Sequence, residues 1–341
     1  MASLGVALVA VVVAAQVAAA CDVGGANAIS TTATASATAT GSVRLMAVGD
    51  VMLARTIGDR IQQDGPDVVF AGVDSQLAGA DLLVINLECN IGTLGHAASK
   101  DYTFQAPPVA VEALAGAGVD VAGQANNHAL DFGPKALAQA RKLVTSRAIG
   151  VVGAGPDRAV AHRPLIEVRN GLRLAFLAYV APFAESSGFD TASWEAKQGT
   201  PGLAVGRPGV IRRDVRAAKS QADLVIVLIH GGIEGATVPA AIQRRLDHAA
   251  ISAGASLVLG AHPHMLQGYK HRGHTLIAYS LGNFVFDGMP GALSDTAILD
   301  VTLDASGVTS FAWIPVRMRH GLPTLAHGTT AARILARLKA Y

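Results

Sequence analysis

A series of short apolar runs, most of them closed by glycine, asparagine, aspartate or histidine, restricts the fold more than any other feature of this sequence. Runs of this length between turn-forming residues are typical of strands that are covered on both faces. Stretches with helical spacing alternate with the runs, and this alternation predicts an α/β fold with mixed sheets. We expect strands at 44–48, 82–86, 119–122, 149–152, 172–179, 224–229, 257–259, 276–279, 297–303 and 308–315. We expect helices at 109–117, 134–146, 209–220 and 240–252.

The end of the chain favours an antiparallel arrangement. Residues 304–307 have the composition of a turn between two apolar runs, so we expect segment 276–315 to fold back on itself. Ile334, Leu335 and Leu338 then recur at helical spacing, which predicts a last helix within 330–341 that packs on the body of the protein.

Polar residues gather where six of the apolar runs end. Because ligands of open α/β sheets bind beyond the carboxyl ends of the strands, we expect these side chains to line one rim. They are carboxylates, amides and imidazoles, which suit hard and borderline metal ions, and no thiolate is among them. The candidate metal ligands are Asp50, Glu88, Asn127, His230, His262 and His264.

Each of these motifs also has an ordinary explanation. Asp50 after Gly49 is typical of a turn or a helix cap, and His230 after an apolar run is typical of a core histidine. The pair His262 and His264 is stronger, because Pro263 favours an extended residue 262 and alternate residues of an extended segment point the same way. Six weak signals at six strand ends together favour a metal site.

Six candidate ligands suit two ions better than one tetrahedral ion. Two ions about 3.5–4 Å apart can share a bridging hydroxide and hold the oxygens of a phosphoryl group. His128 follows the candidate ligand Asn127, and we expect it to act as the catalytic general acid toward the leaving oxygen.

The N-terminal segment predicts export. Residues 4–20 are almost unbroken Leu, Val, Ala and Gly, and they end in small residues before Cys21. This pattern is typical of a signal peptide, here 1–20, and the cysteine predicts lipidation of Cys21 as in bacterial lipoproteins. An ordinary signal peptide cut nearby and an uncleaved anchor stay open as alternatives. We therefore expect an extracytoplasmic protein, either secreted or held at the cell membrane by a lipid or an anchor.

The next segment, 21–42, is rich in Ala, Ser, Thr and Gly and predicts a flexible tether. We expect one folded domain at 43–341, with its chemical motifs within 43–290. The chain has 27 Lys+Arg against 25 Asp+Glu, a balance that argues against a nucleic-acid partner. Its 2 cysteines exclude a disulfide framework and a thiolate zinc finger, and lipidation of Cys21 would leave Cys89 as a free thiol.

Six strings of the sequence match one family pattern: GDVML at 49–53, NLE at 86–88, ANNHALDFG at 125–133, HGGIE at 230–234, HPH at 262–264 and YSLGNF at 279–284. Taken together, they resemble the motifs of the CapA family, the poly-γ-glutamate capsule biosynthesis proteins. The family in turn looks like a branch of the calcineurin-like metallophosphatases. The resemblance therefore implies an αββα sandwich of two mixed β-sheets flanked by helices, with a dinuclear site.

Carried over by position, the resemblance makes Glu88 the bridging carboxylate and His128 the general acid. Met52 departs from the pattern, because it stands where a metallophosphatase has a second metal ligand and a thioether binds hard ions poorly. One metal position is therefore expected to be weak, empty or rebuilt with Glu234. The cofactor implied is one or two divalent ions, Mn, Fe, Zn or Mg. The residues expected around the ligands or against the substrate are Asn86, Asn126, Asp131, Glu234 and Asn283.

Two functions compete. The first is an exported metal-dependent hydrolase or transferase that acts on a phosphoester or an amide-linked anionic envelope polymer, in its synthesis, export or anchoring. The second is a non-catalytic protein that binds such a polymer, or membrane proteins of capsule synthesis, and keeps a structural metal rim. A cytoplasmic phosphatase conflicts with the N-terminal segment.

Two further stretches have open interpretations. The first is a basic cluster at the predicted helix 209–220, which consists of Arg207, Arg212, Arg213, Arg216 and Lys219. This cluster could meet an acidic polymer, although a solvated helix face is favoured. The second is the polar stretch 185–198, which is either a rim loop beside the site or a plain surface excursion.

Overall fold

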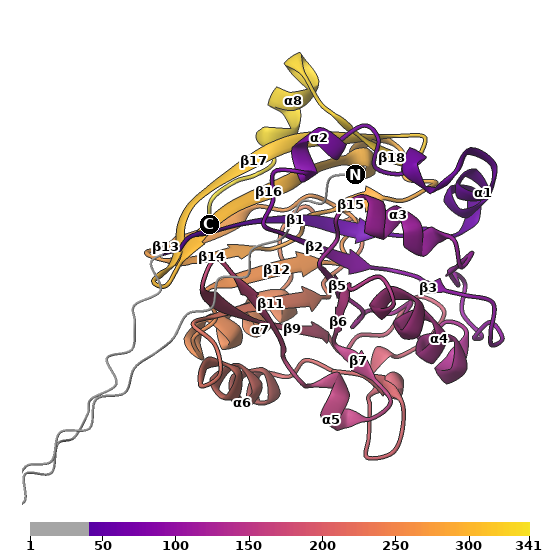
Figure 1. Cartoon of the computed structure of the whole chain (residues 1–341), viewed down its shortest axis with the longest axis horizontal. Coiled ribbons are helices and arrows are strands. Elements are labelled where there is room, and N and C mark those ends of the chain that lie inside the picture. The colour runs from indigo at the N-terminus through magenta and orange to yellow at the C-terminus, as the bar shows by residue number, and fades with distance from the viewer. Residues whose placement is uncertain (1–40) are drawn as a thin grey trace, which may run out of the picture. The chain divides into compact units, whose positions relative to one another are not determined.

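A computed structural model describes residues 41–341, in which most of the strands belong to two large sheets (Figure 1). The first sheet has eight strands in the order β18-β17-β16-β1-β2-β5-β6, with β15 paired to β1. The second has six strands in the order β13-β14-β12-β11-β9-β8. Both sheets contain parallel and antiparallel pairs.

The strands of the first sheet are β1 (Val43–Val51), β2 (Leu82–Leu87), β5 (Val121–Gly123), β6 (Gly150–Val152), β15 (Asn283–Val285), β16 (Asp295–Asp304), β17 (Gly307–Arg319) and β18 (Leu322–Leu325). Those of the second are β8 (Leu165–Arg169), β9 (Leu172–Val180), β11 (Leu224–His230), β12 (Leu257–Ala261), β13 (Tyr269–Arg272) and β14 (Thr275–Ala278). Two small ribbons pair β3 (Asn90–Ile91) with β4 (Gln105–Ala106) and β7 (Ala154–Gly155) with β10 (Gly202–Leu203).

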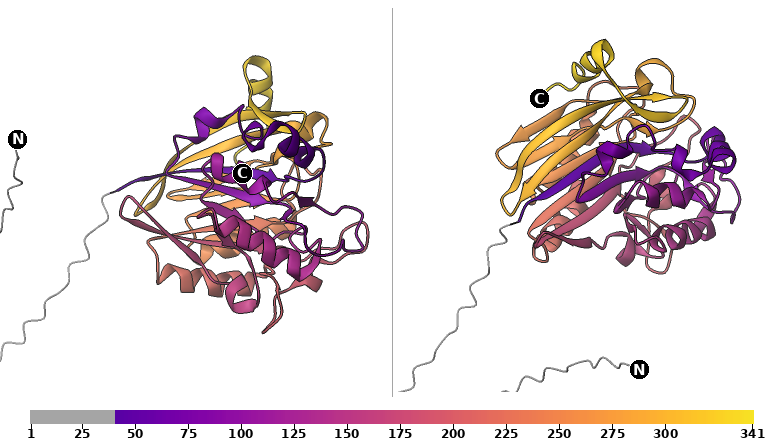
Figure 2. Two further views of the ribbon diagram at one scale, coloured as in Figure 1. Left: turned by 45° about the vertical axis from the view of Figure 1, so that its right-hand side comes forward. Right: turned by 45° about the horizontal axis from the view of Figure 1, so that its top comes forward.

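Side-chain alternation along the strands builds the layers. In β1, Leu45 and Ala47 pack between the two sheets, whereas Met46 and Val48 pack under the helices of the outer layer. Because successive strand residues point to opposite faces, apolar residues at every position give a strand that is buried on both sides. The sheets therefore stack face to face with helices outside them, as the two views of Figure 2 show.

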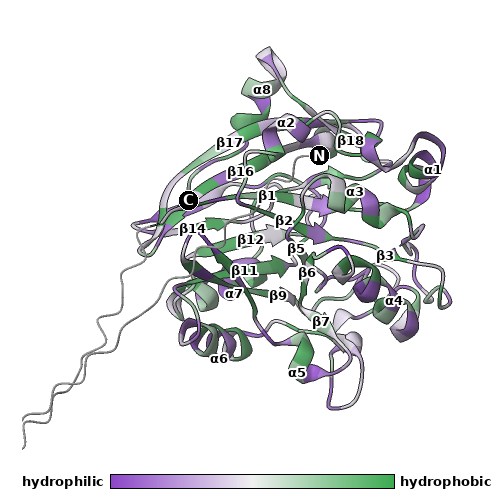
Figure 3. Ribbon diagram, viewed as in Figure 1, coloured by the Kyte–Doolittle hydropathy of each residue, from purple (hydrophilic) through white to green (hydrophobic). Residues whose placement is uncertain are grey.

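The helices cover the outer faces of the sheets. α1 (Arg55–Asp64), α3 (Ala110–Gly116) and α4 (Gly133–Thr145) cover the first sheet, and α6 (Pro208–Lys219) and α7 (Ala241–Ser252) cover the second. In Figure 3 the central strands β11 and β14 are largely coloured hydrophobic, whereas α6 carries hydrophilic residues as well. The short helices are α2 (Asp74–Leu77), α5 (Arg158–Ala161), α8 (Gly328–Leu335) and the 3₁₀ turns η1 (Pro66–Val68), η2 (Thr191–Trp194) and η3 (Gly291–Ser294).

The predicted αββα sandwich of two mixed sheets is confirmed. Each predicted strand and helix overlaps an observed one, and β16 and β17 pair antiparallel across the predicted turn. The prediction that 276–315 folds as one antiparallel unit is wrong, because β14 pairs parallel with β12 in the second sheet. The chain crosses to the first sheet between β14 and β15, and sequence periodicity does not report such a crossing.

The last helix also differs from the prediction. α8 ends at Leu335, so it covers only the first half of the predicted segment 330–341. Its Ile334 is fully buried against Leu266 and Ala297, and Leu338 packs partly buried on the same cluster. The predicted signal peptide, Cys21 and the tether lie outside the described residues, apart from the last residues of the tether. Within 41–341, no helix combines the length and the apolar character needed to cross a membrane.

One buried acid gives a prediction about stability. Asp247 of α7 is 3% exposed, and its Oδ2 has no hydrogen-bond partner among residues 41–341. Burial raises the pKa of Asp247 well above its usual value. The native state therefore favours the protonated acid, and this stabilisation, full below about pH 4, is lost as pH rises toward the native pKa.

We expect Asp247→Asn to raise the free energy of unfolding at pH 7 by on the order of 1 kcal/mol, with little effect near pH 4. Denaturant unfolding at the two pH values measures the difference, and the exposed Asp59→Asn serves as the control. An equal effect at both pH values would contradict this account of Asp247.

Candidate metal centre

The candidate ligands come from the carboxyl ends of strands in both sheets. Asp50 is the last residue but one of β1, Glu88 follows β2, and Asn127 follows β5, all in the first sheet. His230 ends β11 of the second sheet, and His262 and His264 follow β12. The two sheets thus present their donors to each other across one edge of the sandwich.

Asp50 lies at the middle of this group. It is fully buried, and its Oδ1 accepts a 2.8 Å hydrogen bond from the Asn86 amide. Its Oδ2 lies 3.2 Å from Nδ1 of His264 and accepts from the backbone N–H of His262 at 3.4 Å. One carboxylate therefore connects donors of both sheets.

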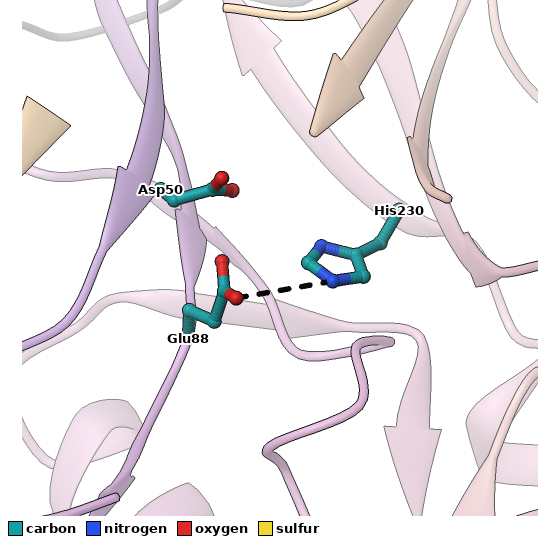
Figure 4. Close-up of side chains that lie close together, drawn as sticks. All are labelled: Asp50, Glu88 and His230. Atoms are coloured by element: carbon teal, nitrogen blue, oxygen red, sulfur yellow. Dashed lines mark ion pairs between the residues drawn. The ribbon is translucent and has the colours of Figure 1, made fainter. Parts of the chain in front are cut away.

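Glu88 and His230 face each other beside Asp50 (Figure 4). One ligand atom from each of the three residues lies within 4.8 Å of the others. Glu88 Oε1 is 4.0 Å from His230 Nε2 and 3.8 Å from His264 Nε2, and it has no hydrogen-bond partner in the described part of the chain. A buried carboxylate oxygen without a donor is costly, and a cation would satisfy it.

Asn127 and His262 complete the group. Asn127 Oδ1 lies 2.8 Å from His230 Nε2, so an amide oxygen and an imidazole nitrogen point at one place. The ring of His262 lies 4.9 Å from that of His230 and 6.1 Å from that of His264. Its Nδ1 is buried and has no partner within 41–341. All six predicted ligands are therefore brought together.

Asparagine side chains contact the candidate ligands and orient them. The amide of Asn86 bridges Asp50 and Glu88, at 2.8 and 3.1 Å, and lies 3.2 Å from His230 Nδ1. Asn126 in turn donates to Asn86 Oδ1 and to the carbonyl of Leu87.

Asn283 plays the same part for His264, whose Nδ1 lies 2.7 Å from its Oδ1. Such contacts fix the orientation of candidate ligands before any ion arrives.

His128 stands beside the group rather than in it. Its Nδ1 lies 2.7 Å from Asp131 Oδ2, and the ring of Phe104 packs 4.2 Å away. Nε2 of His128 is 3.2 Å from the amide nitrogen of Asn127, on the side of the cleft described below. This histidine and carboxylate form a dyad of the kind that orients a general acid or base.

Burial sets the charge state of the cluster. It raises the pKa of Glu88 well above its usual value, and the neighbouring Asp50 adds to this effect. Burial also lowers the pKa of His230 to about 3 and that of His262 far below its usual value. Both rings are therefore neutral, which is the form that binds metal.

Asp50 and His264 behave as an ion pair. Burial alone would raise the pKa of Asp50 and lower that of His264, but their mutual hydrogen bond and opposite charges reverse both shifts.

The backbone at the histidine pair corrects one expectation. An extended segment was predicted at 262, but His262 and His264 have φ angles of 96° and 56°, in the left-handed region. The chain therefore bends at both histidines, and contacts with Asp50 and Asn283 hold this conformation. Non-glycine residues in this region cost energy and cluster at functional sites.

A close approach of two segments explains Gly49. An added Cβ there would lie 1.8 Å from the carbonyl oxygen of Gly282, which accepts a 2.9 Å hydrogen bond from the N–H of Asp50. This contact places Asp50 next to Asn283, its register partner in β15.

Met52 contributes no donor to the cluster. It packs in the apolar core under the outer helices, where its sulfur accepts from the N–H of Ala54 at 3.1 Å. Glu234, the residue expected to replace the ligand that Met52 does not supply, is exposed and lies on the rim of the cleft. Cys89 is free and buried, and burial raises the pKa of its thiol to about 12.

A cleft of about 300 Å³ gives access to this group. His128, Asn127 and His262 line it, so the dyad and two candidate ligands can meet a substrate. Glu185 of the predicted stretch 185–198 lies in its wall, which places the start of that stretch beside the site.

The residues fit a divalent metal centre. Buried carboxylates, neutral imidazoles and an amide oxygen form a donor set for borderline and hard divalent ions. Glu88 Oε1 and His262 Nδ1 are buried and have no hydrogen-bond partner among residues 41–341, so their lone pairs are available to a metal ion. Asp50, Glu88, Asn127, His230, His262 and His264 would hold one or two ions.

The family model for "Bacterial capsule synthesis protein PGA_cap" matches residues 44–288, which contain every strand end of the cluster. The chain belongs to this family. This family member is 30% identical over 279 residues to the PGA biosynthesis protein CapA of Bacillus subtilis, covering 81% of this chain and 72% of that protein. It is also 30% identical to the capsule biosynthesis protein CapA of Bacillus anthracis, covering 81% and 67% of the two chains.

Two solved structures resemble this CapA-like protein more distantly. One is a putative 5'-nucleotidase from Staphylococcus aureus, with a TM-score of 0.44 and 11% identity over 87% of this chain and 58% of that one. The other is TT1561 of Thermus thermophilus, with a TM-score of 0.40 and 14% identity over 78% and 100%.

Sequence reasoning missed Lys100 of this CapA-like protein. Its ammonium group is fully buried, 3.0 Å from Asp131 Oδ1 and 3.1 Å from Glu185 Oε1, and it donates to the carbonyl of Asn127. The rings of Phe189 and Trp194 lie 4.6 and 5.0 Å away. Lys100 therefore ties the dyad to the rim stretch. A lone lysine in a coil carries no local pattern, so only the fold reveals it.

Proposed function

We propose that this protein is a metal-dependent hydrolase of the phosphoesterase type that acts on an anionic polymer of the cell envelope, or on a precursor of that polymer. The observation that carries the proposal is the juxtaposition of the donor cluster with the dyad of His128 and Asp131 at one cleft. The capsule family to which the chain belongs supports the polymer as the setting.

The bound ions, the dyad and Lys100 would each have a separate part in the reaction. When bound, divalent ions supply Lewis acidity and lower the pKa of water. Asp131 holds Nδ1 of His128, so Nε2 is the nitrogen that faces the reaction. Burial lowers the pKa of His128, so the neutral ring would first take a proton from the attacking water at Nε2. It would then give that proton to the leaving oxygen of a phosphoester or the leaving nitrogen of an amide. Lys100 holds Asp131 and Glu185 in place, so the start of the rim stretch stays beside the dyad.

Export is the second part of the proposal. The apolar run 4–20 before Cys21 supports secretion and a lipid anchor at the membrane. Membrane fractionation of cells with the native protein or with Cys21→Ser tests it, and release of the variant from the membrane is the expected result. A native protein found in the cytoplasm would contradict export.

A turnover assay tests the chemistry. We expect the purified protein to hydrolyse bis-p-nitrophenyl phosphate or to cleave poly-γ-glutamate in the presence of Mn²⁺, Fe²⁺, Zn²⁺ or Mg²⁺. Chelation should abolish the reaction, and the same ion should restore it. Full metal occupancy without turnover of either substrate would favour the second function, a non-catalytic polymer-binding scaffold.

A further inference from the structure

A second cavity lies on the outer face of the second sheet, away from the metal centre. It has a volume of about 750 Å³ and lies between α7, the start of α6 and the strands β13 and β14. α6 and α7 pack over β9, β11 and β12 and leave the outer face of the β14 edge beside them. None of the residues that line this cavity lines the cleft.

Helical and strand periodicity bring cations into this cavity. On α7, His248 stands four residues after Arg244 and three after Arg245, so it lies beside both on the helix surface. On β13, Lys270 and Arg272 alternate and so share a face of the sheet.

Arg212 of α6 completes the set, which contains six basic side chains. No Asp or Glu is among the residues that line the cavity.

These charges are not neutralised by neighbours. Within 41–341, none of Arg212, Arg244, Arg245, Lys270 and Arg272 has an ion pair with a carboxylate. Other basic residues of the α6 region do have one. Arg207 pairs with Glu195 at 2.8 Å and Arg213 pairs with Asp214 at 2.7 Å. Asp247 of α7 is buried, with a raised pKa, so it does not offset the positive field.

The rest of the lining is largely apolar. Ile277 of β14 and Tyr279 just after β14 line the cavity, as do Ile251 and Pro208 of the helices. A ligand that fits both surfaces has repeated anionic groups separated by short aliphatic segments. A γ-linked glutamate chain has this chemistry, since each residue carries one free carboxylate and two methylenes.

We propose that this cavity, the basic groove, binds an extended polycarboxylate chain of the poly-γ-glutamate type. The proposal rests on the proposed function for the identity of the polymer. The groove would hold the chain at a distance from the metal centre, so that one molecule retains a long polymer while its cleft acts elsewhere on the chain.

A binding experiment on the purified protein tests the groove. Fluorescently labelled poly-γ-glutamate is titrated at low and at physiological salt, and anisotropy reports its Kd. The variant R245Q/K270Q/R272Q removes three cations of the groove. The matched control, K142Q/R163Q/R216Q, removes three exposed cations outside it, so the net charge of the two variants is the same.

We expect the groove variant to weaken binding about tenfold or more, and the control by less than about threefold. Circular dichroism verifies that both variants fold. Equal weakening in both variants, or none in the groove variant, overturns the proposal. Tighter groove-dependent binding of polyphosphate, or of vesicles with anionic lipids, overturns the assignment to polycarboxylates.

A further arm separates this inference from the metal chemistry. Asp50→Asn should retain polymer binding whatever it does to turnover, and the groove variant should still hydrolyse a small phosphodiester at the native rate. Loss of polymer binding in Asp50→Asn would place the polymer at the cleft and contradict the groove. Absence of turnover in the native protein would overturn the proposed chemistry and leave the binding result intact.

Discussion

Replacing Glu88 by glutamine should abolish metal-dependent stabilisation and at the same time make the metal-free protein more stable. Glu88 is fully buried with an unpartnered Oε1, so the neutral amide removes the cost of a buried carboxylate. We expect the metal-free variant to gain about 1 kcal/mol in its free energy of unfolding. The native protein should gain about 2.7 kcal/mol when the ion is at 100 times its Kd, and the variant should gain almost nothing.

Denaturant unfolding with and without each ion measures both effects. Asp59→Asn, an exposed carboxylate of α1 outside the cleft, is the control and should keep the response to metal. If Glu88→Gln destabilises the metal-free protein and still responds to ions like the native protein, then Glu88 is a structural residue and not a ligand.

Replacing His128 by glutamine should lower kcat by about 10²–10³-fold and leave the metal content unchanged. The reason is its place, because His128 contacts Asp131 and lines the cleft but lies outside the three-residue cluster of Asp50, Glu88 and His230. Turnover of a phosphodiester and metal analysis on the same sample give the two numbers. The exposed His96→Gln is the control.

Two results would contradict this role of His128. Loss of the ions in His128→Gln would make the ring a ligand, and unchanged turnover would remove it from the reaction. Asp131→Asn should show a smaller loss in kcat than His128→Gln, since Asp131 acts through the ring that it orients.

The strands and the positions of the candidate ligands could be predicted because both are local properties. An apolar run closed by Gly49 and Asp50 reports a buried strand and its end, and the same holds for Ile229 and His230. Since most of these strands run parallel, placing their carboxyl ends at one edge needs no further information.

The remainder depends on contacts between distant segments. The bend at His262 and His264 comes from the packing of the segment after β12 against Asp50 and Asn283, not from Pro263 alone. Lys100 acquires its partners from residues 27 to 85 positions away. The basic groove joins cations of α7 to cations of β13, and only the register of β13 with β14 places them together.

The metal content of the purified protein decides whether the six candidate ligands form a metal centre. The protein is prepared without a polyhistidine tag and incubated with Mn²⁺, Fe²⁺, Zn²⁺ or Mg²⁺. Unbound ions are then removed, and elemental mass spectrometry measures the ions that the protein retains. We expect about one or two ions per chain for at least one metal, and almost none in Glu88→Gln. A native protein that retains no more of any ion than Glu88→Gln would contradict it.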